Sequence, residues 1–442
     1  MAKRTIFITV QEAYILQKVW RVSLAEKLRV ESDIRFIIVT IPAMRADMEQ
    51  EYGPKGFIVE SIYIEETKLL DKVISFFMRA GYPSGMNDIQ SQRAWYDGRS
   101  RVPPILKRIV ANVIGRTWIF ASSLRALDLS ISPAPQVAAL FEKYSPDTVF
   151  SSVLLYGAVD GPLLREAKRR HIHTVAMTRS WDNLTGYSYI RVVPDIFLAQ
   201  GAFLVDVIKK FQHIRRAQTR IVGIPHYDQY LDHSLYLSRE EFCKELDIDP
   251  AHSIITYGAV GAPLFPKEAD MADVFEDLIE RDLIKNVRAI FRPHPAYPFT
   301  CSKQFKHVVH DDSRLDDLPH FINTLLHTDV LVTAGSTLIL DAACFDTPVV
   351  TIAFDGTQPP KNKWFSTALF YKHFYHLKTL FSRAPAARIA HSRDELAAEI
   401  NAYINDPSLD ADARNKALAY FVEPYDGHSC ERLARTIVEK VE

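Results

Sequence analysis

The stretch "VLVTAGSTLILDAACFDTPVVTI", residues 330 to 352, decides the fold of this chain. A β-branched apolar run ends at Thr333, Gly335 permits a tight turn, and Ser336 can open a helix that leads to a second apolar run. Two short apolar strands joined by a helix form a βαβ unit, whose parallel strands are buried on both faces. The stretch therefore predicts a parallel α/β sheet.

The same alternation of strand and helix runs along most of the chain in two series. The first series of apolar runs is "RTIFITV" (4–10), "DIRFIIVT" (33–40), "GFIVESIYI" (56–64), "DTVFSSV" (147–153), "HTVAM" (173–177), "DIFLA" (195–199) and "TRIVGI" (219–224). The second series is "SIITYGAV" (253–260), "VRAIFR" (287–292), "DVLVT" (329–333) and "PVVTI" (348–352). We therefore predict two Rossmann-like domains whose strand ends face a central cleft.

The predicted boundary between the domains lies near residue 230, with an N-terminal domain over 1–230 and a C-terminal domain over 231–425. A mostly helical insertion, about 65–140, interrupts the first domain and carries the stretches "SFFMRAGYPSG" and "RSRVPPILKRIV". We favour a helical subdomain packed on the sheet, and a surface for an acceptor or for membrane lipids is the alternative.

Composition excludes several classes of protein. The chain has 442 residues, 48% of them hydrophobic, and its 53 basic and 54 acidic residues nearly cancel, which gives no reason to expect nucleic acid as a partner. The cysteines lack the CxxC spacing of a zinc site or the pattern of a disulfide framework; they are Cys243, Cys301, Cys344 and Cys430. No run approaches the ~18 apolar residues of a membrane helix, and the start resembles no signal peptide. We expect a cytoplasmic protein.

A second short stretch, "IFRPHPAY" (290–297), follows another predicted strand. Prolines on both sides hold His294 extended, and Pro293 does the same for Arg292, so the strand end presents a cation and an imidazole. Their donors and charge suit a diphosphate. The alternatives are an ordinary strand exit and, for Arg292, a neighbouring carboxylate partner.

Two further strand ends of the same domain carry groups suited to an anionic nucleotide. In "YGAVGAP" (257–263), Gly258 and Gly261 permit close backbone approach, although a plain turn is the alternative. After Gly335, a helix start at Ser336 and Thr337 would offer N–H groups and hydroxyls to phosphate, although a simple N-cap is the alternative. Asp341 lies one turn beyond Thr337, where a carboxylate could accept hydrogen bonds from ribose hydroxyls.

These motifs resemble the donor domain of GT-B glycosyltransferases, and most closely the branch with CDP-glycerol glycerophosphotransferases and bacterial polysaccharide transferases. The resemblance covers about 173–352 and "EPYDGHSCERLARTIVEKV" (423–441), and it is weak over 65–140. It implies that residues 426–442 form a helix that returns to the N-terminal domain.

The resemblance also implies roles for single residues of the donor domain. His294, Ser336 and Thr337 would bind donor phosphates, and Asp341 would bind ribose. Asp341 departs from the family pattern, because many relatives have the longer Glu there.

The N-terminal domain carries the candidates for catalysis on the acceptor. "SWDN" (180–183) resembles a segment of related transferases and holds Asp182, a base or acceptor contact whose favoured alternative is a turn cap. Trp181 of that segment is more often a packing residue than a sugar platform. Glu12 lies just beyond the first strand, and an exposed helix-start glutamate is its alternative.

Together these observations predict a GT-B-type glycosyltransferase of polysaccharide biosynthesis. It would move a sugar from a nucleotide-activated donor to a glycan, lipid-linked or other acceptor, with no cofactor beyond that substrate. No metal is expected, since the "DAD" at 410–412 does not follow a strand. The alternatives are a CDP-glycerol-type glycerophosphotransferase, a nucleotide-sugar 2-epimerase and a non-catalytic nucleotide-binding module. Peripheral membrane contact through 65–140 stays open.

Overall fold

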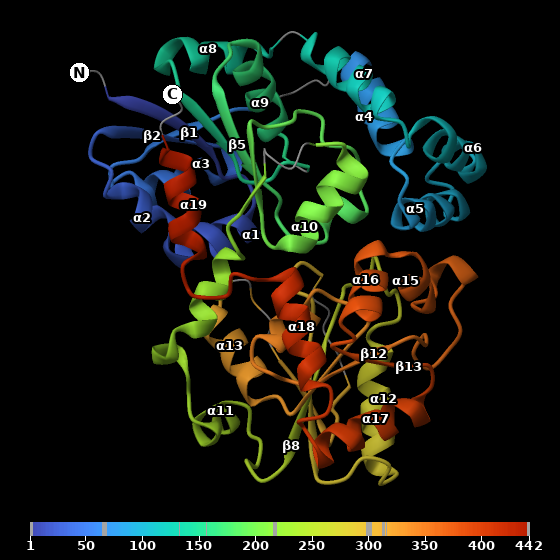
Figure 1. Ribbon diagram of the computed structural model, residues 1–442. Coiled ribbons are helices and arrows are strands. Elements are labelled where there is room, and N and C mark those ends of the chain that lie inside the picture. Colours follow the sequence, from blue (N-terminus) through green and yellow to red (C-terminus); the bar gives the residue numbers. More distant parts are fainter. Residues whose placement is uncertain are drawn as a thin grey trace. The chain divides into compact units, whose positions relative to one another are not determined.

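A computed structural model gives the fold of the chain (Figure 1). It describes residues 3–63, 69–131, 133–155, 157–214, 219–297, 303–311, 314 and 316–439. Contacts divide the chain into a first unit, Met1–Gln229 with Phe421–Glu442, and a second unit, Tyr230–Tyr420. Each unit is built on one parallel sheet, so the predicted α/β fold with two Rossmann-like halves is confirmed. The assignment of the halves to acceptor and donor stays a prediction.

The sheet of the first unit has seven parallel strands in the order β3-β2-β1-β4-β5-β6-β7. Its strands are β1 (Arg4–Thr9), β2 (Ile34–Thr40), β3 (Ile58–Ser61), β4 (Thr148–Ser151), β5 (His173–Met177), β6 (Ile196–Ala199) and β7 (Thr219–Ile221). The chain starts in the middle, winds outward to β3 and then crosses back to β4. The strand order therefore reverses between β1 and β4, which is where ligands bind in such sheets.

Apolar side chains on both faces of the strands account for this sheet. Along β1, Ile6 and Ile8 enter one hydrophobic core, while Phe7 between them enters the core of the opposite face. The covering helices are α1 (Ala13–Ile15), π-helical η1 (Leu16–Leu24), α2 (Ala25–Arg29), α3 (Pro42–Tyr52), α8 (Pro135–Tyr144), α9 (Asp160–Arg169), α10 (Ala202–Val207) and π-helical η4 (Ile208–Gln212).

The C-terminal tail forms the helix α19 (Ser429–Val438). This helix adds Leu433 and Ile437 to the hydrophobic core that contains Ile6, so the tail packs on the first unit. Residues 440–442 of the predicted tail lie outside the described residues.

The insertion between β3 and α8 is helical, as predicted. It consists of α4 (Leu69–Ala80), α5 (Gly85–Tyr96), α6 (Pro104–Ile109), the π-helical segment η2 (Val110–Ile114) and α7 (Trp118–Leu129), which we call the helical insertion. It has a small core of its own, in which Ile74, Met78 and Tyr82 pack with Ala121 and Tyr189.

The sheet of the second unit has six parallel strands in the order β10-β9-β8-β11-β12-β13. They are β8 (Ser253–Gly258), β9 (Val287–Arg292), β10 (Val308–His310), β11 (Val330–Thr333), β12 (Val349–Ile352) and β13 (Arg388–Ala390). The edge strands β10 and β13 are three residues long and were not predicted, because so short a run gives no readable apolar period.

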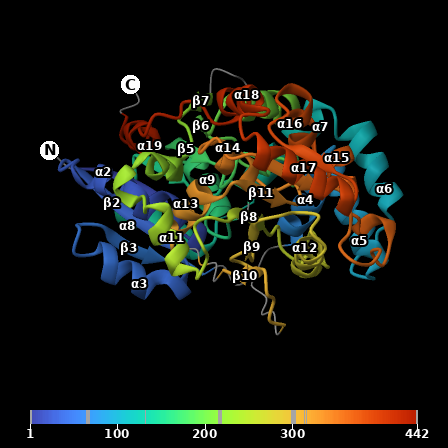
Figure 2. The same cartoon turned by 90° about the horizontal axis from the view of Figure 1, so that it is seen from below.

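Helices cover both faces of the second sheet (Figure 2). On one face lie α12 (Asp270–Glu280) and α17 (Arg393–Asn405); on the other lie α11 (Arg239–Glu245) and α13 (Leu318–His327). The remaining helices of the unit are α14 (Leu338–Ala343), α15 (Ala368–His373), α16 (Tyr375–Arg383) and α18 (Ala411–Phe421). In this sheet the order reverses between β8 and β11, so the ends of these strands are its expected ligand edge.

Three observations concern membrane spans, metal sites and disulfide bonds, which the composition was used to judge. No helix in the described part of the chain is long and apolar enough to cross a membrane. Within the same residues no cluster of histidine, cysteine and acidic side chains could hold a metal ion. Cys243, Cys344 and Cys430 are free thiols, and Cys301 lies outside the described residues.

Candidate functional site

The three predicted strand ends of the second unit meet at one edge of its sheet. Gly258, at the end of β8, pairs with Arg292 of β9 on one side and with Thr333 of β11 on the other. The hydroxyl of Thr333 also donates to the carbonyl oxygen of Gly258 at 2.7 Å. The edge formed by the ends of β9, β8 and β11, which we call the donor edge, therefore holds the Arg-His exit, the "YGAVGAP" turn and the "AGST" turn side by side.

His294 sits in a tight turn just past β9. The N–H of Tyr297 donates to the carbonyl oxygen of His294 at 2.8 Å, and the two rings lie 5.3 Å apart between centroids. The N–H of Ala296 donates to Nδ1 of the His294 ring at 3.1 Å, so the ring proton is carried on Nε2. An Nε2–H group can donate a hydrogen bond to a phosphate oxygen.

Arg292 has a different environment from the one that phosphate binding requires. Its side chain is buried, forms an ion pair with Asp311 and lies 5.0 Å from the ring centroid of Phe321. Asp311 also accepts from Nε2 of His320 at 2.9 Å. Burial alone would raise the pKa of Asp311, but the hydrogen bond from His320 and the charge of Arg292 lower it. This environment fits the alternative considered for Arg292, an ion pair with a neighbouring carboxylate, better than it fits phosphate binding.

A buried glutamate, which sequence reasoning missed, organises the turn after β8. Glu268 accepts hydrogen bonds from the N–H groups of Val260 (2.6 Å) and Gly261 (2.7 Å) and from the hydroxyl of Tyr257 (3.0 Å). Burial raises the pKa of Glu268 to about 7 against these hydrogen bonds, which lower it. Two N–H groups that a phosphate could have used are thus bound to a protein carboxylate.

The glycines of this turn make room for protein side chains. A Cβ at Gly258 would lie 2.4 Å from Cδ1 of Leu338, and one at Gly261 would lie 2.5 Å from the ring of Tyr297. Gly261 also has φ +93°, which favours glycine. Packing therefore accounts for both glycines, and a close approach by a ligand is not needed to explain them.

The turn after β11 has the predicted form with a later helix start. Gly335 has φ +76°, and the hydroxyl oxygen of Ser336 accepts from the N–H of Leu338 at 3.3 Å. The helix α14 begins at Leu338 rather than at Ser336, and Thr337 occupies its N-cap position without a side-chain capping bond. Because α14 has only six residues, its dipole is small.

Asp341 lies in the middle of α14 and is almost completely buried, with 6% of its surface exposed. Its Oδ1 accepts a hydrogen bond of 2.6 Å from the hydroxyl of Tyr230, which is itself fully buried. This partner, 111 residues away in the chain, gives Asp341 a structural contact that no local motif could have revealed.

The first unit gathers polar groups at the corresponding edge, where β1 and β4 end. Asp160, the first residue of α9, is completely buried and accepts from the hydroxyls of Thr9 and Ser151, both at 2.5 Å. It also accepts from the N–H of Val153 at 3.3 Å and from the side-chain amide of Gln11. Burial raises the pKa of Asp160 to about 6, while its hydrogen bonds lower it. Sequence reasoning did not single out this residue.

Glu12 lies three positions beyond the end of β1, close to this group. Burial of the Asp160 carboxyl is the main cause of its raised pKa, and the charge of Glu12 adds a smaller upward contribution. The carboxylate of Glu12 forms an ion pair of 3.3 Å with Arg179, whose guanidinium lies 5.8 Å from the ring centroid of Tyr14. The first unit thus has one partly exposed carboxylate beside a buried one at its switch point.

Asp182 lies in the loop after β5 and is half-buried. Its carbonyl oxygen accepts from the N–H (2.9 Å) and the hydroxyl (2.6 Å) of Thr185, while its carboxylate takes no part in capping and accepts from Asn183 at 3.3 Å. Trp181 beside it is buried with its ring edge-on to Phe203 and Phe421, so it packs as expected. The catalytic roles of Glu12 and Asp182 stay predictions.

Comparison with known families agrees with the resemblance that the sequence motifs carry. Residues 177–439 match the model of the family described as CDP-glycerol:poly(glycerophosphate) glycerophosphotransferase. The chain belongs to this family. The matched span contains the whole donor edge and Asp182, and Glu12 lies outside it. A comparison with curated protein sequences finds no significant match.

Solved structures share the fold over nearly the whole chain. The UDP complex of Staphylococcus aureus MnaA has a TM-score of 0.53 at 10% identity, covering 98% of this chain and 96% of that one. A putative UDP-N-acetylglucosamine 2-epimerase from Listeria monocytogenes has a TM-score of 0.56 at 11% identity, covering 99% and 96%. A variant of the wall teichoic acid polymerase TagF has a TM-score of 0.53 at 10% identity, covering 99% and 88%. At these identities the likeness shows the fold alone, and the predicted GT-B-like resemblance is confirmed.

The first prediction concerns His294. Replacing His294 by Ala should weaken the binding of CDP or UDP at least about tenfold, because a hydrogen bond to a charged group contributes about 1.5–3 kcal/mol. Isothermal titration calorimetry measures the change. The matched control is His252→Ala at the opposite end of β8, where the sheet has its other edge. Equal affinities for wild type and His294→Ala would remove His294 from the donor site.

The second prediction separates the two roles of Asp341. If its carboxylate accepts from ribose hydroxyls, Asp341→Asn should weaken nucleoside diphosphate binding by about 1–2 kcal/mol and leave pyrophosphate binding nearly unchanged. Tyr230→Phe removes this hydrogen bond to Asp341 and leaves the carboxylate in place, so it should lower the melting temperature with little loss of affinity. If both variants have a lower melting temperature than wild type, and each loses affinity for nucleoside diphosphate and pyrophosphate to the same extent, Asp341 is structural.

The third prediction uses the raised pKa of Asp160, about 6 in the fold against an ordinary 3.8. Between these values the folded state binds more protons than the unfolded chain, so this contribution to stability is present at low pH and lost as the pH rises through about 6. The stability of wild type relative to Asp160→Asn should therefore increase by up to about 2–3 kcal/mol between about pH 7 and pH 4.

Denaturant unfolding at several pH values measures this difference. The matched control is Asp47→Asn, at an exposed position of α3, which removes a carboxylate without disturbing the buried group. A relative stability of Asp160→Asn that stays flat, or that improves as the pH falls, would show that burial does not control this carboxyl.

Proposed function

We propose that the protein transfers a unit from a nucleotide diphosphate donor to a glycan or lipid-linked acceptor. The observation that carries the proposal is the donor edge inside the family match, where His294 follows β9 and the hydroxyls of Ser336 and Thr337 follow β11, the two strands that flank β8. A diphosphate is bound by hydrogen-bond donors from several directions, and the edge of a parallel sheet brings several strand ends close enough together to supply them.

Two kinds of donor fit this proposal, and they differ in the bond that breaks. A nucleotide sugar would give up its sugar and leave a nucleoside diphosphate, which is the reaction that the motifs predict. CDP-glycerol would give up glycerophosphate and leave CMP, because the phosphoanhydride P–O bond to the glycerol-bearing phosphorus breaks and the bridging oxygen stays with CMP. The family description names the second donor, and that observation favours glycerophosphate transfer as the second candidate.

The acceptor hydroxyl must lose a proton during either transfer, and the first unit offers two carboxylates for this role. Glu12 is partly exposed, and its carboxylate lies 3.3 Å from the guanidinium of Arg179. Asp182 is half-buried, and its carboxylate already accepts from Asn183. We prefer Glu12 as the base, with Asp182 as a contact to the acceptor. A lipid-linked acceptor would bring the protein into peripheral contact with a membrane.

The fourth prediction is read from one turnover assay in the presence of EDTA. With CDP-glycerol as donor the expected nucleotide product is CMP, and with a sugar donor it is the nucleoside diphosphate. We expect turnover to survive the chelator, because the proposal assigns the charge of the phosphates to protein donors and to no metal. Chromatography of the nucleotide products checks both points.

Other outcomes of the same assay identify the rival functions. Loss of activity in EDTA with recovery in magnesium or manganese would overturn the metal-free scheme. Conversion of a UDP-sugar to its 2-epimer without an acceptor would identify an epimerase. Nucleotide binding without turnover of any donor would identify a binding module.

A further inference from the structure

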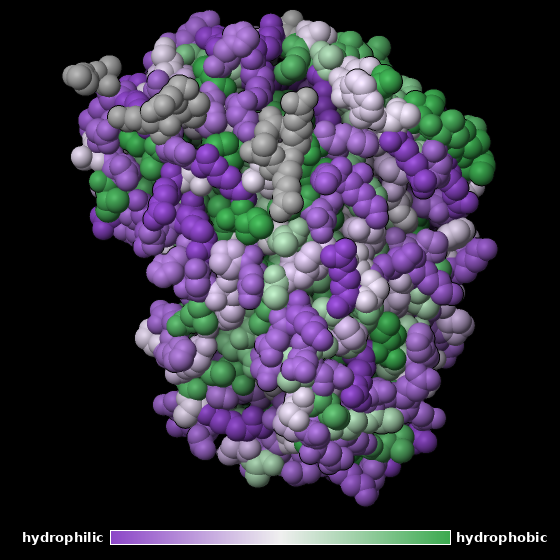
Figure 3. All heavy atoms as spheres, in the orientation of Figure 1, coloured by the Kyte–Doolittle hydropathy of each residue, from purple (hydrophilic) through white to green (hydrophobic). Residues whose placement is uncertain are grey.

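Exposed large apolar side chains are concentrated in the helical insertion. Among the described residues, the most exposed of them include Leu69 (78%), Val113 (68%), Trp118 (64%) and Ile119 (58%). Figure 3 shows hydrophobic surface gathered over α6 and α7, in contrast to the mostly hydrophilic surface of the second unit in the same view. Soluble proteins seldom expose so many large apolar side chains in one region unless it contacts something.

These side chains form faces of helices with a regular spacing. On α4 the exposed residues are Leu69, Leu70, Val73, Phe76 and Phe77, while Ile74 and Met78 of the same helix are buried in the small core. Along α6 and η2 they are Ile105, Leu106, Ile109, Val113 and Ile114, and Trp118 and Ile119 continue the series at the start of α7. A helix that buries one apolar face in the protein and exposes a second apolar face can pack that second face against a binding partner.

Positive charge accompanies the apolar surface. Residues 69–129 contain nine lysines and arginines, four aspartates and no glutamate, whereas the whole chain is almost neutral. Lys72, Arg79, Arg101 and Arg116 are exposed, and no described carboxylate lies within ion-pair distance of them. The insertion is therefore both apolar and basic on its outer surface.

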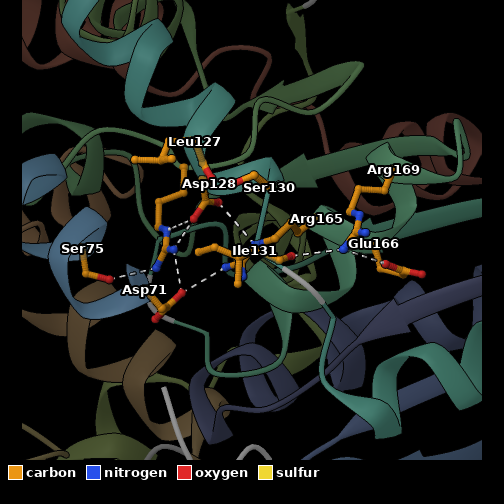
Figure 4. A network of polar contacts seen from close by, with 10 residues as sticks. Asp71, Ser75, Leu127, Asp128, Ser130, Ile131, Arg165, Glu166 and Arg169 are labelled. Carbon is orange, nitrogen blue, oxygen red and sulfur yellow. Dashed lines mark hydrogen bonds and ion pairs between the residues drawn. The ribbon is translucent and has the colours of Figure 1, made fainter. Parts of the chain in front are cut away.

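The aspartates of the insertion explain why the surface is basic (Figure 4). Asp71 of α4 and the fully buried Asp128 of α7 point inward to Arg165 of α9 and to Arg191. Arg191 donates to Asp71 at 2.7 Å and also to Asp128. Arg165 donates to Asp71 at 3.2 Å and forms an ion pair with Asp128 at 3.4 Å. Two of the four acidic groups are thus used to fasten the insertion to the sheet domain, while Lys72, Arg79, Arg101 and Arg116 remain exposed.

We propose that this outer surface, formed by the exposed apolar and basic residues of α4, α6, η2 and α7, docks on a bilayer that contains anionic phospholipids. Amphipathic helices with aromatic and aliphatic residues on one side and basic residues beside them lie in the headgroup region of membranes. Tryptophan, as at Trp118, is favoured at that boundary. The inference rests on the proposed use of a lipid-linked acceptor and names the surface through which the enzyme would reach it.

A second copy of the chain is a less suitable occupant of the surface. In a two-fold dimer the same patch would meet itself, so the exposed cations of one copy would face those of the other without acidic partners. An anionic bilayer matches both the apolar and the charged character of the patch.

The fifth prediction is tested by sedimenting the full chain with vesicles of phosphatidylcholine, with and without phosphatidylserine. Wild type should bind the anionic vesicles at least about tenfold better than the neutral ones, and salt should weaken the binding. The double variants Trp118→Ser with Ile119→Ser, and Arg101→Glu with Arg116→Glu, should each lose at least about tenfold. Val30→Ser, which removes an exposed apolar side chain of the first unit outside the insertion, is the matched control.

Calorimetry with CDP or UDP on the same variants keeps this inference separate from the proposed function. Intact donor binding with no vesicle binding by the wild type overturns the membrane inference alone, and vesicle binding without donor binding or turnover overturns the proposed function alone. Equal binding to neutral and anionic vesicles, or no effect of either double variant, also contradicts the inference. A wild-type dimer that Trp118→Ser with Ile119→Ser converts to monomers, with no vesicle binding, would assign the surface to self-association.

Discussion

Parallel pairing of strands that are buried on both faces is the constraint on which the rest of this structure depends. Such strands can carry only apolar or fully satisfied side chains along their length, so chemistry is confined to their ends. In both sheets the chain starts in the middle and winds outward in two directions, which leaves one place where adjacent loops diverge. The donor edge and the group around Asp160 both occupy that place.

Buried carboxylates shape these strand ends. Glu268 fixes the turn after β8 and Asp311 holds Arg292; Asp160 collects donors from β1 and β4. Each accepts several hydrogen bonds, and such bonds can offset the cost of burying a charged group. These carboxylates occupy backbone and side-chain donors at the strand ends, and the proposed contacts to a nucleotide are therefore His294, Ser336 and Thr337.

The sequence predicted the elements whose signals are local. Apolar runs located most strands, and Gly335 located the turn after β11. The missing information is long-range: Tyr230 lies 111 residues from Asp341, and nothing near Arg292 showed that Asp311 neutralises it. The sequence left open whether Gly258 and Gly261 permit close approach by a ligand or form a plain turn, because only the fold reveals that the side chains of Leu338 and Tyr297 lie against them. Local patterns thus predict where a site lies better than they predict which groups are available there.

The helix α9 connects two features that lie in different parts of the first unit. It begins at Asp160, beside the ends of β1 and β4, and it carries Arg165, which holds Asp71 and Asp128 of the insertion. The five residue steps from Asp160 to Arg165 span about 7.5 Å along a helix. With the insertion docked on a bilayer as proposed, this part of α9 would set the height above the lipid headgroups of the edge where β1 and β4 end. The reach required of an acceptor chain would then be fixed by a single helix.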